Sequence, residues 1–298
     1  MDPTRRLPES FVETARAFLD GSKEPVAPRD ASTVVLLRNG DDRSGGLEVY
    51  LLRRTVDMAF AGGFCVFPGG GVDQRDFDHQ IGWVGPTPQE WAQLLDTTEE
   101  HARALVCAAV RETFEESGVL LAGPTEDTVV DDTTGEDWER DRRRLEAREL
   151  SFTDFLDQRG LRLRTDLLQL WGSWVTPIFE PRRYDTRFFV AALPEGQVTR
   201  DVSTESDHVV WMKVRDVIDA VDDGRLAMLP PTYATCLEVY EHASTDEVLA
   251  AAEQRDRTPI LPEMQVDPEG GYLALPERLV ALGNSVAARR SEERDAVS

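Results

Sequence analysis

The chain has 298 residues, of which 41% are hydrophobic and 30% are charged, and its formal net charge is −23. This composition is typical of a globular protein with enough chain for one large domain or two modest ones. The negative charge argues against nucleic acid and against an anionic membrane as partners, because both attract a basic surface. An acidic protein that handles phosphates therefore needs a metal ion or a local arginine cluster at its site.

The chain start and the cysteines bear on the cellular compartment. The first ten residues, MDPTRRLPES, lack the apolar segment of a signal peptide, and no apolar run reaches membrane-spanning length. Cys65, Cys107 and Cys236 are far apart and follow no metal-ligand spacing. We therefore expect buried free thiols in a reducing compartment, the cytoplasm. Whether the protein forms a homodimer is left open.

The first hundred residues predict a helix, several strands and a glycine-rich loop. Residues 1–29 hold a short amphipathic helix and a proline-containing linker. Residues 31–38 and 47–54 are apolar runs rich in Val and Leu, which are typical of buried strands. A further short strand leads into the loop FPGGGVD, and residues 77–97 contain two Trp and a short predicted helix, PQEWAQLLD.

The stretch RETFEESGV ends the next predicted helix. Thr97 and Glu100 have the spacing of a capping box, which would start this helix near Thr98. Gly118 is a natural end, because helices commonly stop at a residue with positive φ.

Three glutamates gather in the last turns of this helix. At about 100° per residue, the following side chains share one face, which we take as the buried one: Val106, Val110, Thr113 and Phe114. Glu112, Glu115 and Glu116 fall on the opposite face, and Arg111 alone cannot neutralise them. A solvated charged face is one interpretation. The glycine-rich loop before the helix favours another, a site for a divalent cation, because Mg²⁺ binds through carboxylates and substrate phosphates.

The second half of the chain mixes strands with helices. Residues 123–165 are strongly charged and are interpreted as an insertion that is helical from about residue 136. Strands are predicted within 167–179, 186–193 and 208–214, and helices within 214–223, 231–243 and 245–255. The tail from residue 258 has weak signals, and we expect its last ten residues to be disordered. This pattern predicts an α/β or α+β fold.

FPGGGVDQRD followed by RETFEESGV resembles the Nudix hydrolase signature: a glycine, five residues, an acidic residue, and then Arg-Glu-any-any-Glu-Glu-any-Gly-apolar. With Gly70 as the first glycine, Asp76 stands where the family usually has Glu. The second half matches from Arg111 to Gly118, with Thr113 in place of the usual apolar residue. The spacing departs from the family, because Arg111 follows Asp76 by 35 positions, an insertion into the signature.

A narrower resemblance accounts for this insertion. The stretches RTVDMAFAGGFCVFPGGGVD, AAVRETFEESG, WVTP and RRYDTRFFVA are similar to the peroxisomal coenzyme A diphosphatase branch of the Nudix hydrolases and its bacterial relatives. The resemblance implies an α/β fold, namely a Nudix-type α/β/α sandwich with helical insertions and a C-terminal helical extension. It predicts a Nudix domain at 30–225, with insertions at about 77–97 and 123–165, and an extension and tail at 226–298.

The resemblance also implies a Mg²⁺ or Mn²⁺ site and the residues that form it. The metal ligands would be Glu115, Glu116 and the carbonyl of Gly70. Glu112 would be a further ligand or the general base, and Arg111 would orient the glutamates, since a planar guanidinium suits two carboxylates. Metal ions that bridge phosphoryl oxygens and lower the pKa of a bound water supply most of the catalysis in such reactions.

Other site residues have equally plausible structural interpretations. Glu205 resembles the extra catalytic glutamate that many members take from a late loop, and an exposed loop glutamate is the alternative. The expected contacts to substrate are Arg54, Gly69, Arg182, Arg183 and Tyr184. For the last three of these, a structural turn before a strand is the alternative.

Three hypotheses follow for the function. The first is a diphosphatase of coenzyme A or acyl-coenzyme A, and the second keeps the chemistry but takes ADP-ribose, NADH or a nucleotide sugar. The family motif for coenzyme A places an arginine four residues before Gly63, where this chain has Ala59. The third is a Nudix-fold ligand-binding or regulatory module without catalysis. The complete carboxylate set favours an enzyme, because a module that only binds needs no such set.

Overall fold

A mixed sheet forms the centre of the protein in the computed structural model, which describes residues 8–40, 46–55, 61–78, 80–204 and 206–297. The strand order is β10-β2-β1-β9-β8, and β1 runs parallel to β9 while the other neighbours along this order pair antiparallel. The bounds of these strands are β1 Arg29–Asn39, β2 Leu47–Arg54, β8 Gln169–Val175, β9 Tyr184–Ala192 and β10 Ser206–Lys213. Two short strands extend it, β3 (Cys65–Val66) beside β2 and β4 (Gly69–Gly71) beside β1.

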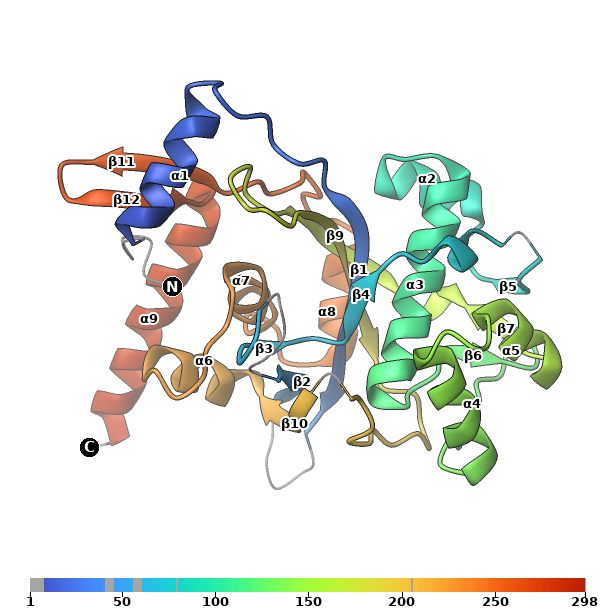
Figure 1. Cartoon of the computed structure of the whole chain (residues 1–298). Helices are drawn as coiled ribbons and strands as arrows, with labels where there is room; N and C mark the ends of the chain where they lie inside the picture. The colour runs from blue at the N-terminus through green and yellow to red at the C-terminus, as the bar shows by residue number, and fades with distance from the viewer. Residues whose placement is uncertain (1–7, 41–45, 56–60, 79, 205, 298) are drawn as a thin grey trace.

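Helices cover both faces of this sheet (Figure 1). Along β1, Val34 and Leu36 pack on the side of α3 (Glu99–Ser117), and Val35 and Leu37 pack in the core on the opposite side. This alternation follows from the period of two in a strand. The opposite face is covered by α6 (Val214–Asp222), α7 (Pro230–Val239) and α8 (Thr245–Ala252). The predicted α/β/α sandwich is thereby confirmed.

The helix α3 begins one residue later than the capping-box spacing predicts. Thr98 is the N-cap, and its hydroxyl accepts from the backbone N–H of His101 at 3.2 Å, so the expected pairing of Thr97 with Glu100 is wrong. The end at Gly118 agrees with the prediction, with φ at 76°. The idea of one solvent-facing side is also wrong, because Glu115 and Glu116 are 9% and 8% exposed.

The two insertions enclose α3 from outside. The first is preceded by η1 (Gln74–Phe77) and contains β5 (Trp83–Val84) and α2 (Pro88–Leu95). The second contains α4 (Glu136–Glu146) and α5 (Phe152–Arg159), and is flanked by β6 (Ala122–Gly123), β7 (Arg162–Arg164) and η2 (Thr165–Leu167). A small sheet of order β5-β7-β6 joins the insertions to each other, on the side of α3 that faces away from the central sheet (Figure 1). The carboxylate helix is therefore an inner layer, which explains its burial.

The C-terminal region is ordered and is not purely helical. The hairpin of β11 (Glu263–Asp267) and β12 (Gly270–Ala274) contacts α1 (Glu9–Leu19), and α9 (Glu277–Val297) packs along α7. The last ten residues were expected to be disordered, whereas the helix α9 extends to Val297.

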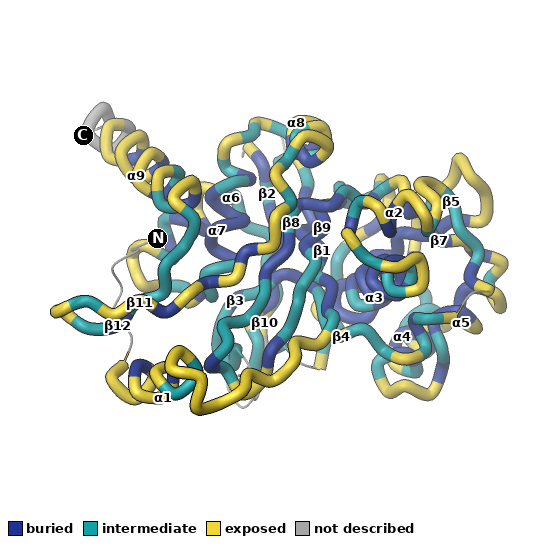
Figure 2. The backbone as a smooth tube through the Cα atoms, turned by 90° about the horizontal axis from the view of Figure 1, so that it is seen from above, coloured by how far each residue is buried: buried dark blue, intermediate teal, exposed yellow. Residues whose placement is uncertain are grey.

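The position of α9 is fixed by burial of parts of its inner side. Leu279 and Val286 lie in the core, and Arg290 pairs with Asp219 and Asp222 of α6. Figure 2 shows the contrast between the buried strands of the central sheet and the exposed outer side of α9. Among the described residues, no helix has both the length and the apolar character that a membrane crossing requires.

Candidate active site

The glycine-rich loop lies directly against α3. Gly69 and Gly70 of β4 pair with Thr33 and Ser32 of β1, which fixes the loop on the sheet. A Cβ at position 70 would lie 2.5 Å from Glu112 Oε1, so a larger residue there would displace the Glu112 carboxylate from the loop. The backbone N–H of Gly69 donates to Glu116 Oε2 at 2.8 Å. The structure thus brings Glu112 and Glu116, one turn apart on α3, to the loop that the sequence analysis assigned to the same site.

Arg111 holds the carboxylates of this site together. Its guanidinium forms a bidentate pair with Asp76, with both N–O distances at 2.9 Å. It also donates to Glu112 Oε1 at 2.8 Å, to Glu115 Oε1 at 3.4 Å and to the carbonyl of Gly71 at 3.1 Å. The loop and α3 therefore meet despite the insertion between Asp76 and Arg111.

The electrostatics of this cluster favour an added cation. Burial, together with the charge of Glu112, raises the pKa of Glu115 to about 7, and Arg111 opposes this shift. Burial also raises the pKa of the Cys107 thiol, which lies 3.6 Å from Asp76 Oδ1. Arg111 brings one positive charge to three carboxylates, and a divalent cation would offset the remaining repulsion.

A large pocket opens over the glycine loop. Its volume is about 780 Å³, within the usual range for ligand sites. One part of the wall is polar and includes Gly69, Gly70, Asp73, Arg111, Glu112 and Arg148. Another part is apolar and includes Phe64, Phe67, Trp174, Phe188, Leu229, Pro230, Pro231, Pro262 and Leu273. The pocket can therefore receive a ligand with a charged group and a long apolar arm.

The structure distributes the expected substrate contacts unevenly. Arg54 and Tyr184 line the pocket. Arg183 is buried and does not line it, because its guanidinium donates to the carbonyls of Thr176 and Val26. Its contacts brace the N-terminal linker against the β8–β9 connection, which corresponds to the structural alternative.

Three further predicted positions are not in the pocket lining or cannot be placed. Arg182 is exposed and does not line the pocket. Glu205 and Ala59 lie outside the described residues.

The carboxylates suit a divalent cation without forming a complete cage. Across the described ranges, no group of three or more His, Cys, Asp and Glu side chains is arranged to hold a metal ion. Arg111 donates to two of the glutamates, as described above, and Mg²⁺ commonly uses only one or two protein carboxylates plus substrate phosphates. The oxygens of Glu112 and Glu116 beside the Gly69–Gly70 backbone are hard donors of this kind.

Several pocket residues escaped the sequence analysis. Asp73 lies just before the first insertion and Arg148 lies within the second, and their side chains approach each other at 3.8 Å. Pro262 and Leu273 reach the pocket from the C-terminal region. A positive φ of 60° at Arg148 is a backbone feature that composition and periodicity do not report.

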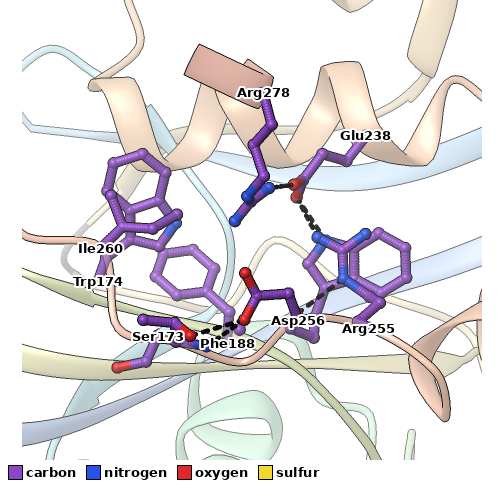
Figure 3. A pocket seen from close by; sticks show the side chains of 11 residues that line it. Ser173, Trp174, Phe188, Glu238, Arg255, Asp256, Ile260 and Arg278 are labelled. Atoms are coloured by element: carbon purple, nitrogen blue, oxygen red, sulfur yellow. Dashed lines mark hydrogen bonds and ion pairs between the residues drawn. The ribbon is translucent and has the colours of Figure 1, made fainter. Parts of the chain in front are cut away.

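A second, much smaller cavity lies between β8 and the C-terminal region (Figure 3). Glu238 accepts from Arg278 at 2.8 Å and pairs with Arg255 at 2.7 Å, and Arg255 stacks 3.7 Å above the Trp171 ring. The volume of about 10 Å³ suits one water molecule at most. This cluster is a clamp for the C-terminal region and not a substrate site.

Comparison with known proteins agrees with this geometry. The family model described as the NUDT19 Nudix domain matches residues 89–238, which is half of the chain. The chain belongs to the NUDT19 Nudix domain family. The matched range includes α3 and the strands β8, β9 and β10 of the central sheet. The strands β1 to β4 with the glycine loop, and the pocket residues Pro262 and Leu273, lie outside it.

Curated relatives and a solved structure extend the match beyond this domain. Acyl-coenzyme A diphosphatase NUDT19 of Xenopus laevis is 22% identical over 244 residues, covering 70% of this chain and 64% of its own length. The Gallus gallus protein of the same name is 25% identical over 272 residues, covering 74% and 70%. The chain thus spans less than two-thirds of the Xenopus relative. A crystal structure of a Nudix hydrolase from Alicyclobacillus acidocaldarius is 28% identical, with a TM-score of 0.65, and covers 76% of this chain and 96% of that one.

Proposed function

We propose that this NUDT19-family protein is a metal-dependent diphosphatase that cleaves the diphosphate bond of coenzyme A or acyl-coenzyme A. The observation that carries the proposal is the approach of Glu112 and Glu116 to the Gly69–Gly70 backbone, which lines a large pocket together with Glu112. The names of the Xenopus and Gallus relatives support the substrate.

The residues divide the work as follows. Glu112, Glu115, Glu116 and the Gly70 carbonyl would hold Mg²⁺ or Mn²⁺. When bound, the metal supplies charge to the phosphoryl oxygens and acidifies a water molecule. Glu112, as ligand or as general base, would take up the proton of that water. Arg111 keeps the glutamates in place, and the small glycine loop leaves room for the diphosphate.

The apolar wall suits the other end of coenzyme A. A pantetheine arm and an acyl chain need an uncharged surface, and the start of α7 offers one. Pro230 and Pro231 occupy its first turn, so two of the amides that a helix start usually presents are absent. A phosphate would gain little there, whereas an alkyl chain gains about 0.8 kcal/mol per buried CH₂ group. The predicted boundary between the Nudix domain (30–225) and the C-terminal extension (226–298) would then cross the substrate pocket, because Pro230 and Pro231 of the extension line it.

The test is a panel of diphosphates incubated with the purified protein and Mg²⁺ or Mn²⁺. Coenzyme A and its octanoyl ester should be cut, with water added across the diphosphate. Free coenzyme A should give 3′,5′-ADP and 4′-phosphopantetheine, both identifiable by mass spectrometry. Cleavage of ADP-ribose or NADH alone would keep the diphosphatase chemistry and reject coenzyme A. A protein that binds these compounds but cleaves none would be the non-catalytic module.

A further inference from the structure

A second buried arginine, which belongs to the second insertion, binds the backbone of the carboxylate helix α3. Arg142 of α4 is 1% exposed, and its Nη1 donates to the backbone carbonyl of Glu115 at 2.6 Å. The helix ends at Ser117, so this carbonyl has lost the amide donor that a continuing helix would supply. Arg142 takes that place within the turn that carries Glu115 and Glu116.

The same guanidinium is held by two carboxylates of its own helix. Glu139 accepts from Nε and Nη2, both at 3.0 Å, and Glu146 accepts from Nη1 at 3.1 Å. Two charges of opposite sign to Arg142 thus fix its orientation, as a planar fork donor allows. The position of the guanidinium, and with it the last turn of α3, depends on α4.

Glu146 continues this chain of contacts to a second segment. Its Oε1 accepts from the backbone N–H of Thr204 at 3.0 Å and from the Thr204 hydroxyl at 2.6 Å. Thr204 directly precedes Glu205 in the sequence, the candidate catalytic glutamate. One carboxylate therefore links the segment leading to Glu205 with the arginine that holds α3.

Arg200 reinforces the arrangement from the same segment. Its backbone N–H donates to the carbonyl of Ser117 at 2.9 Å, and its guanidinium donates to Glu139 at 3.1 Å and to the carbonyl of Thr133 at 3.0 Å. Cations at the C-terminal end of a helix also complement its dipole. The segment 200–204 is thus tied at one end to α3 and at the other to α4.

We propose that α4 of the insertion is a positioning device for the diphosphatase site, in which the relay from the Glu115 carbonyl through Arg142 and Glu146 to Thr204 sets the distance between the carboxylates of α3 and the segment that leads to Glu205. The proposal rests on the function proposed above and assigns it positioning residues on an insertion. Arg142 and Glu146 act through the carboxylate helix and touch no substrate.

The test compares Thr204→Val, Glu146→Ala and the double variant with two matched controls. Thr204→Ser keeps the hydroxyl. Arg143→Gln removes the exposed arginine that donates to the same Glu139 at 2.8 Å from the solvent side of α4. Three quantities are measured: the dissociation constant for Mn²⁺ alone by calorimetry, kcat and KM for coenzyme A, and amide hydrogen exchange in residues 199–204.

Thr204→Val and Glu146→Ala should each lower kcat and weaken Mn²⁺ binding by about tenfold, the usual effect of losing a group that orients ligands, with KM within about twofold of the wild type. The double variant should be no worse than the poorer single one, because both substitutions act on one relay. Both controls should match the wild type.

Two results would overturn the relay. One is faster exchange in residues 199–204 of Thr204→Val with kcat and Mn²⁺ affinity unchanged. The other is strict additivity in the double variant. If the wild type leaves coenzyme A intact, the proposed function fails, while the Mn²⁺ and exchange measurements still decide the relay.

Discussion

Two buried arginines, Arg111 within α3 and Arg142 of α4, both contact Glu115 and differ in the carboxylates and cations around them. Arg111 contacts Asp76, Glu112 and Glu115 from the side of the glycine loop. Arg142 contacts Glu139 and Glu146 on the side of the insertion. On this second side Arg200 and the exposed Arg143 also pair with Glu139, so the arginines outnumber the two carboxylates.

The loop side has unbalanced negative charge and can bind a cation, whereas the carboxylates of the insertion side are already paired with arginines. Buried charges are costly unless they are paired. The insertion side satisfies this requirement with its own residues. The loop side gathers carboxylates in excess of its arginine, and a cation with substrate phosphates would complete it. The end of α3 is thus stabilised by the insertion side, and on the loop side it keeps an excess of negative charge.

The largest expected effect comes from reducing the charge on the loop side. Glu116→Gln should lower kcat by about 10²-fold or more, since a lost metal ligand costs several kcal/mol at the transition state. The amide oxygen of Gln can still accept from the Gly69 N–H, so the fold should survive. Steady-state kinetics with Mg²⁺ and circular dichroism measure the two effects.

Glu238→Gln is the matched control for this change. Glu238 is a carboxylate between Arg255 and Arg278, at the clamp of the C-terminal region. The kcat of Glu238→Gln should stay within about twofold of the wild type, because Glu238 lies outside the site. Normal activity in Glu116→Gln, or failure of that variant to fold, would assign Glu116 a structural role.

A smaller effect is expected on stability when metal is added. A ligand that binds only the folded state at 100 times its dissociation constant stabilises by about 2.7 kcal/mol. Mn²⁺ should therefore raise the unfolding midpoint of the wild type. The rise should be much smaller for Glu112→Gln, because this variant lacks one of the negative charges on the loop side. Arg143→Gln should respond like the wild type. An equal response in all three proteins would show that Mn²⁺ binds elsewhere.

The sequence predicted the parts of this comparison that depend on local pattern. The strands containing Val34 to Leu37 follow from an apolar run, and the end of α3 follows from Gly118. The meeting of Glu112 with the glycine loop followed from the resemblance, which bridged the insertion. The first two features depend on residues close together in the sequence, and the third depends on a family motif.

The insertion side was not predictable in the same way. Arg142 lies in a charged helix, and nothing in its spacing distinguishes it from the exposed Arg143 next to it. Its burial depends on α4 packing against α3, which is a tertiary contact. Similarly, the strands β5, β6 and β7 are two or three residues long, and they pair only through contacts between segments far apart in the sequence.

The smallest expected effect tests the insertion side, through substitutions of two helix-ending glycines. Gly118 has φ at 76°, and a Cβ there would lie 2.7 Å from Arg200 Nη2. Gly160, at the end of α5, has φ at 63° and nothing within 4 Å of its Cβ position. Gly160→Ala should cost about 1–2 kcal/mol of unfolding free energy through backbone strain alone.

Gly118→Ala should cost the same strain plus a further contribution of about 1 kcal/mol, because it displaces the guanidinium from Glu139 and Thr133. Urea denaturation of both variants measures the difference, and subtracting Gly160→Ala removes the strain that they share. Equal losses would mean that Arg200 moves aside freely and contributes little to the balance. A larger loss at Gly118, accompanied by a kcat reduced by a few-fold, would show that the insertion side supports the carboxylates of the loop side through this contact.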